Sequence, residues 1–138
     1  MKQITTIILL TVTFFAGNAK SLYQHEQASE KLVLNNGAKW KIDQPTSKNV
    51  TRLQQIAGKA GVRTLADYHQ AGAALQAGIN QMIKECRMKG PDHLALHKWL
   101  EPLMEQVALL NQATNAASAK IHFNEVKKRL TLFNQYFQ

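Results

Sequence analysis

The fold is decided by residues 65–110, which read LADYHQAGAALQAGINQMIKECRMKGPDHLALHKWLEPLMEQVALL. Apolar side chains recur every three or four positions, the spacing that places them along one face of an α-helix. Gly90 is suited to end a helix and Pro91 to begin one, so we expect two antiparallel helices joined by a tight corner. The first should end near Met88, and Pro102 should kink the second. The two apolar stripes are Leu65, Tyr68, Ala71, Leu75, Ile79, Met82, Ile83 and Cys86, then Leu96, Trp99, Leu100, Leu103, Val107 and Leu110.

The sequence on either side of this stretch also has a helical period. Residues 50–57 begin a shorter helix, with Thr46 and Ser47 as candidate N-caps, and we expect a break between about 58 and 64. A turn at 111–115 precedes the last helix. Gly72 and Gly78 inside the long stripe are explained by close helix packing. The chain is therefore predicted to be all-α, a small up-and-down bundle of three to four helices. The last stripe consists of Ala119, His122, Phe123, Val126, Leu130, Phe133 and Phe137.

A short β-hairpin is predicted before the helices, in KLVLNNGAKWKID, residues 31–43. Asn36-Gly37 is a strong hairpin signal. A three-residue loop at 35–37 pairs Leu34 with Ala38 and segregates the apolar side chains, so we prefer that register. The apolar face should pack on the bundle through Trp40, and residues 31–138 should form a single helical-bundle domain that includes the hairpin. That face consists of Leu32, Leu34, Ala38, Trp40 and Ile42.

The first 19 residues, MKQITTIILLTVTFFAGNA, have the pattern of a secretory signal peptide. Lys2 precedes an apolar run that is too short to span a membrane, and Gly17 and Ala19 supply the small residues of a cleavage site. Residues 20–30 are polar and are expected to be a flexible N-terminal segment. We therefore expect a periplasmic or secreted protein with no transmembrane segment after signal cleavage.

Composition narrows the function. The 138 residues carry 17 Lys+Arg against 9 Asp+Glu, a formal net charge of +8, and a single cysteine that excludes an intramolecular disulfide. Export argues against nucleic acid as a partner, whereas the positive charge favours an envelope protein or an anionic surface. No Ser/His/Asp arrangement or glycine-rich phosphate loop is visible, so we expect no enzyme. The sequence does not predict the oligomeric state.

The corner between the two long helices carries a candidate metal site formed by Cys86, Met88, His93 and His97. Thiolate, thioether and imidazole together suit copper, and a cysteine with two histidines would also suit zinc, the less favoured ion here. Three carboxylates, Glu85, Asp92 and Glu101, are candidates to orient an imidazole. There are two alternatives to this interpretation. Cys86 would be an inert residue of the core, or it would form a disulfide with another chain.

The segments from Leu34 to Trp40 and from Ile83 to Gly90, with His93 and the run from Leu96 to Leu100, resemble a group of small exported helical proteins of Bacteroidota-type bacteria. The group has no established activity. The resemblance implies an exported helical fold and a coherent Cys-Met-His-His segment, but no reaction. Two functions follow as hypotheses: a metal-binding or metal-handling protein, most plausibly for copper, and a metal-free module that binds an envelope protein or an anionic surface.

Overall fold

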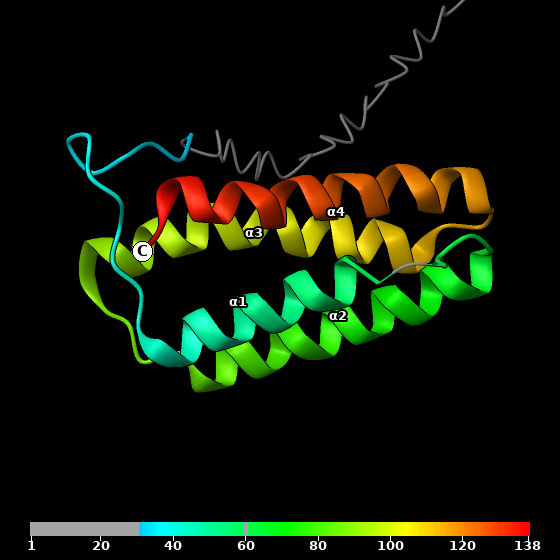
Figure 1. The fold of residues 1–138 in the computed structure, drawn as a ribbon, viewed down its shortest axis with the longest axis horizontal. Helices are drawn as coiled ribbons and strands as arrows, with labels where there is room; N and C mark the ends of the chain where they lie inside the picture. The colour runs from blue at the N-terminus through cyan, green and yellow to red at the C-terminus, as the bar shows by residue number, and fades with distance from the viewer. Residues whose placement is uncertain (1–30, 60) are drawn as a thin grey trace, which may run out of the picture.

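The computed structural model describes residues 31–59 and 61–138, and these form an all-α four-helix bundle. The helices are α1 (Gln44–Ala57), α2 (Leu65–Glu85), α3 (Gly90–Gln112) and α4 (Ala116–Tyr136). They run up and down in sequence order along the long axis, and α4 also contacts α1 and α2, which closes the bundle (Figure 1). The predicted signal peptide and the predicted flexible segment 20–30 lie outside the described residues. In the described part of the chain, no helix is both long enough and apolar enough to cross a membrane.

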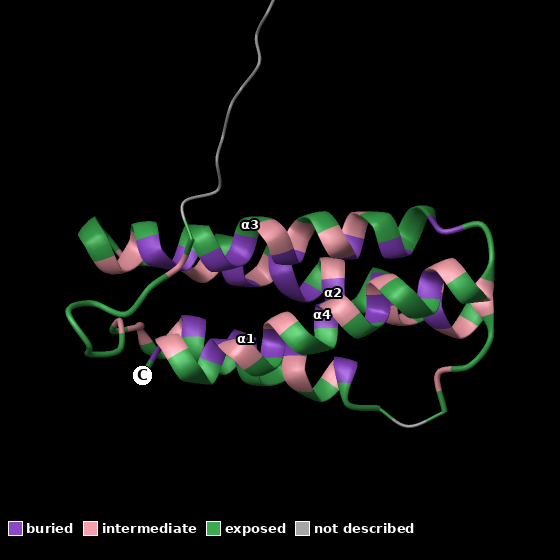
Figure 2. Cartoon of the chain, turned by 90° about the horizontal axis from the view of Figure 1, so that it is seen from above, coloured by how far each residue is buried: buried purple, intermediate pink, exposed green. Residues whose placement is uncertain are grey.

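The predicted apolar stripes form one shared core. Buried positions turn inward on all four helices (Figure 2), and the largest fully buried side chains come from each of them. Ile83, by contrast, is exposed, and Cys86 is only partly buried. The fully buried large side chains are Leu53, Leu75, Ile79, Met82, Leu103, Val107, Leu110, Val126 and Leu130.

The predicted break after the first helix is confirmed, and a capping box begins α2. Thr64 Oγ1 accepts a hydrogen bond from the Asp67 backbone N–H at 3.2 Å, while the Thr64 N–H donates to the Asp67 carboxylate at 2.8 Å. This reciprocal pair satisfies two backbone donors that a helix start leaves free. The predicted turn before the last helix is also confirmed, because α3 ends at Gln112 and Asn115 caps α4.

Two predictions about helix ends are wrong, and the contacts of Asp43 explain both. Asp43 caps α1 in place of the predicted Thr46 or Ser47, because its Oδ1 accepts from the Thr46 N–H at 2.8 Å. Its other oxygen accepts from the Arg87 N–H at 2.9 Å. That bond holds the chain extended after Glu85, so α2 ends before the predicted Met88. Gly90, with φ +69°, then begins α3 instead of ending α2.

The predicted β-hairpin is wrong, since the described residues contain no β-strand. Asn35 and Ala38 exchange both backbone hydrogen bonds, at 2.8 and 2.9 Å, so the loop has two residues, not three. Asn36 and Gly37 both have positive φ, 51° and 87°, the conformation in which an Asn-Gly turn is favoured.

The chain then leaves the turn and pairs with the end of α4. The Trp40 N–H donates to the Tyr136 carbonyl at 2.8 Å, and the Gln138 N–H donates to the Trp40 carbonyl at 3.0 Å. Backbone groups freed at the end of α4 thus pair with Trp40 in place of a second hairpin strand. Leu32, Trp40 and Ile42 still pack against the core, as predicted, while Leu34 and Ala38 of the predicted apolar face are exposed.

Candidate functional site

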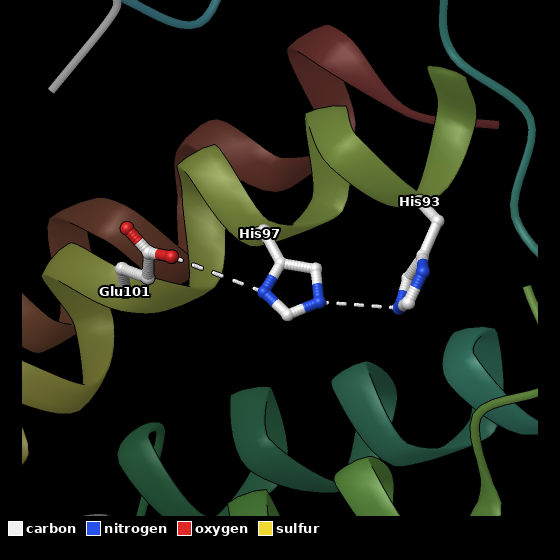
Figure 3. Close-up of polar contacts among 3 residues, drawn as sticks. All are labelled: His93, His97 and Glu101. Carbon is white, nitrogen blue, oxygen red and sulfur yellow. Dashed lines mark hydrogen bonds and ion pairs between the residues drawn. The ribbon is translucent and has the colours of Figure 1, made fainter. Parts of the chain in front are cut away.

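Two imidazoles meet on the first turns of α3. His93 and His97 are four residues apart, so they lie one above the other on the same helix face. Their Nε2 atoms are 3.2 Å apart, and their rings stand edge to face with centroids separated by 4.6 Å. Figure 3 shows both rings projecting from the same side of the helix. The sequence predicted this pair, and the structure brings it together.

A carboxylate lies beside the second imidazole. Glu101 is one turn further along α3, and its Oε1 is 3.9 Å from His97 Nδ1 (Figure 3). If the carboxylate approached to hydrogen-bond distance, it would favour a proton on Nδ1 and leave the lone pair of His97 on Nε2, the atom that faces His93. Half of the His97 side chain is exposed, so solvent and ions reach the pair directly.

The two predicted sulfur ligands are placed differently. Cys86 is the C-cap of α2, partly buried and packed against the core. Met88 is also partly buried, and its Sδ accepts a hydrogen bond from the buried Thr46 hydroxyl of α1 at 3.7 Å. Over residues 31–59 and 61–138, no three His, Cys, Asp or Glu side chains are grouped to hold a metal ion. The structure therefore brings together the imidazoles of the predicted site without its thiolate.

The other two carboxylates predicted near the histidines have different partners. Glu85 accepts from the Asn49 amide at 2.7 Å and from the Gln81 amide, and these hydrogen bonds hold the pKa of Glu85 below its usual range. Asp92 accepts from the Lys41 backbone N–H at 3.0 Å. Of the three carboxylates considered, only Glu101 is beside an imidazole.

Positive side chains surround the corner. Lys84, Arg87 and Lys89 are all exposed, and one nitrogen of the Arg87 guanidinium donates to the carbonyls of Lys84 and Cys86, at 2.9 and 3.1 Å. These hydrogen bonds hold the Arg87 charge against the C-terminal end of α2, where the helix dipole is negative. Because the negative helix end partly compensates the guanidinium charge, Arg87 repels an approaching metal cation less strongly than a free arginine would.

Sequence reasoning missed the role of Asp43, which ties α1 to the 86–89 connector. An aspartate directly before Gln44-Pro45 was the available signal, because Pro is favoured in the first turn and Asp at the N-cap. Comparison with known protein families, with curated proteins and with solved structures found no match to this chain.

Proposed function

We propose that this is an exported metal-binding protein, and that His93 and His97 are the ligands that anchor a copper ion at the α2–α3 corner. The observation that carries the proposal is the 3.2 Å separation of the two Nε2 atoms. A tetrahedral ion bound by imidazole at about 2.0–2.1 Å would hold its two nitrogens about 3.3 Å apart. Replacing the proton between the rings by a metal ion thus requires almost no movement of the helix.

Copper is preferred because of the donor atoms. Imidazole binds copper in both oxidation states, and a site of nitrogen donors binds Cu²⁺ more tightly than other divalent ions of the first row. Zinc is the less favoured alternative. Glu101 would act through His97 by fixing its tautomer.

The sulfur atoms of Cys86 and Met88 belong to the proposal as ligands specific to Cu(I). Both lie in or beside the four-residue connector between α2 and α3, so a change of connector conformation is needed to turn them toward the imidazoles. Thiolate and thioether are soft donors that favour Cu(I) over Cu²⁺. Their contribution should therefore appear in the affinity for the reduced ion.

The test is metal titration of single variants against a competing chelator, with Cu(I) under anaerobic conditions and with Cu²⁺ in air. We expect His93→Ala and His97→Ala each to weaken the affinity for both ions by about tenfold or more. Cys86→Ser should weaken the affinity for Cu(I) more than that for Cu²⁺. The nitrogen hyperfine pattern in the electron paramagnetic resonance spectrum of bound Cu²⁺ should lose the coupling of one nitrogen in each histidine variant.

The matched control is His122→Gln, which removes an imidazole from α4. The His122 ring contacts Gln106 at 3.1 Å and is not part of the corner, so copper affinity should not change. Unchanged affinity in both His93→Ala and His97→Ala would end the metal hypothesis and leave the metal-free binding module.

A further inference from the structure

A groove away from the histidine pair lies between the start of the described chain and helices α3 and α4. Its volume is about 320 Å³. Apolar side chains form most of the wall, among them Leu32, Trp99 and Leu132, and its charged members are Lys31, Lys98 and Arg129. Among residues 31–59 and 61–138, no acidic side chain lines it. Apolar walls with cationic side chains suit a ligand that has an apolar body and a negative head.

Arg129 supplies an independent reason to expect an anion. Its Nε is buried, and among the described residues it has no hydrogen-bond acceptor. A buried charged donor without an acceptor is costly, and such groups are rare unless a ligand or solvent satisfies them. The backbone at this residue is fixed, because the Arg129 carbonyl accepts from Trp99 Nε1 at 2.9 Å. Arg129, which lines the groove, therefore projects from a fixed point on the backbone of α4.

A second hollow of about 210 Å³ adjoins the groove, since Leu32 and Lys98 line both. Apart from Lys98, its lining residues are apolar, among them Val33, Trp40 and Leu94. Val33 is 59% exposed and Leu94 is 65% exposed, so this apolar surface is open to solvent. Leu32 lines both hollows, so a flexible chain whose head lies at Arg129 would pass along it toward the second hollow.

We propose that this groove binds an amphipathic carboxylate, a medium-chain fatty acid, with the carboxylate on Arg129 and Lys31 and the alkyl chain over Leu32 and Trp99. A planar carboxylate matches the planar guanidinium, since it can accept two parallel hydrogen bonds. The groove takes one chain rather than the two of a membrane phospholipid. This site shares no residue with the proposed metal site, so either proposal can fail alone.

The experiment follows intrinsic tryptophan fluorescence while decanoate is added to the full chain. Trp99 lines the first hollow and Trp40 the second, and these are the two tryptophans of the sequence. We expect a saturable change with decanoate. Decanol, which keeps the chain without the charge, and acetate, which keeps the charge without the chain, should each bind at least about tenfold more weakly.

Arg129→Gln should weaken decanoate binding about tenfold or more, while the matched control Lys128→Gln should leave it within about twofold. Lys128 is the neighbouring cation, and it is exposed, does not line the groove and pairs with Glu125. If Arg129→Gln does not fold, Leu132→Glu is the second variant, since a carboxylate on the groove wall should abolish decanoate binding by repulsion.

Five results would overturn the proposal. Four of them are the absence of saturable decanoate binding, equal affinity for decanol, unchanged decanoate affinity in Arg129→Gln, and binding to anionic lipid vesicles without binding to free decanoate. The last would assign the groove to a membrane surface. A dimer of the wild-type chain that dissociates in Leu132→Glu would assign it to a second copy and would also reject the fatty acid.

Discussion

At the scale of single residues, two glycines determine how closely the helices approach α2. A Cβ atom at Gly78 would lie 2.7 Å from Leu53 Cδ2, and one at Gly72 would meet the Asn111 side chain and lie 3.2 Å from Leu110 Cγ. Each glycine weakens an isolated helix by about 1 kcal/mol relative to alanine. The sequence predicted that close packing explains them, and the contacts with α1 and α3 confirm it.

Gly78→Ala is therefore expected to destabilise the protein by about 1–2 kcal/mol, although alanine is the better helix former. Leu53 is fully buried, so its Cδ2 methyl group must shift within the packed core to admit the new Cβ atom. Urea unfolding measures the change. Ala77→Gly is the matched control, because Ala77 is the exposed neighbour in α2 and should lose only about 1 kcal/mol through helix propensity. A more stable Gly78→Ala would show that Leu53 repacks freely.

At the scale of elements, the Asp43 carboxylate joins the start of α1 to the connector between α2 and α3. Partial burial raises the pKa of Asp43, but the hydrogen bonds from Thr46 and from the Arg87 backbone outweigh it and hold the pKa below its usual range. A group with a lowered pKa in the folded state stabilises the fold above its unfolded pKa, near 4. That stabilisation is lost as the pH falls through the lower, folded value.

Asp43→Asn should reduce the free energy of unfolding by about 1 kcal/mol at neutral pH, since an asparagine oxygen still caps the helix but carries no charge. The difference from the wild type should shrink as the pH falls below about 4, where the wild-type carboxylate becomes protonated. Denaturant unfolding across this pH range measures the effect. Glu105→Gln, at an exposed position of α3, should change little at any pH. A difference that stays constant with pH would contradict the role of the charge.

At the scale of the whole molecule, the segment before α1 and the residues after α4 are joined by backbone hydrogen bonds at one end of the bundle. Phe137 is 3% exposed and stacks on Phe133, with ring centroids 4.6 Å apart and Trp99 nearby. Beside it, the Ile42 N–H donates to the Gln138 carbonyl at 3.1 Å. Backbone pairing and ring packing therefore hold both ends of the described chain against α3.

Phe137→Ala should cost about 3–5 kcal/mol, because it removes a buried ring from this cluster. It should also loosen the backbone pairing between the segment before α1 and the end of the chain. The amide hydrogens of Trp40 and Ile42 should then exchange faster than those in the centre of α3. Hydrogen exchange followed by nuclear magnetic resonance measures both effects. Gln135→Ala, at an exposed site on the same turn of α4, is the control. Unchanged protection at Trp40 would mean that the backbone pairing does not depend on the ring.

The sequence by itself determined the four helices, the breaks between them, most of the core and the His93–His97 pair. All of these depend on spacings of three and four residues, which are local properties of a helix. Only the tertiary structure decided where α2 ends, because Asp43 reaches Arg87 across 44 positions of the chain. Tertiary structure also decided the pairing of Trp40 with Phe137, and it placed the Met88 thioether against the Thr46 hydroxyl of α1. The physical reason is the same in each case, since a hydrogen bond or contact between distant segments depends on how the helices pack and leaves no periodic signal in the sequence.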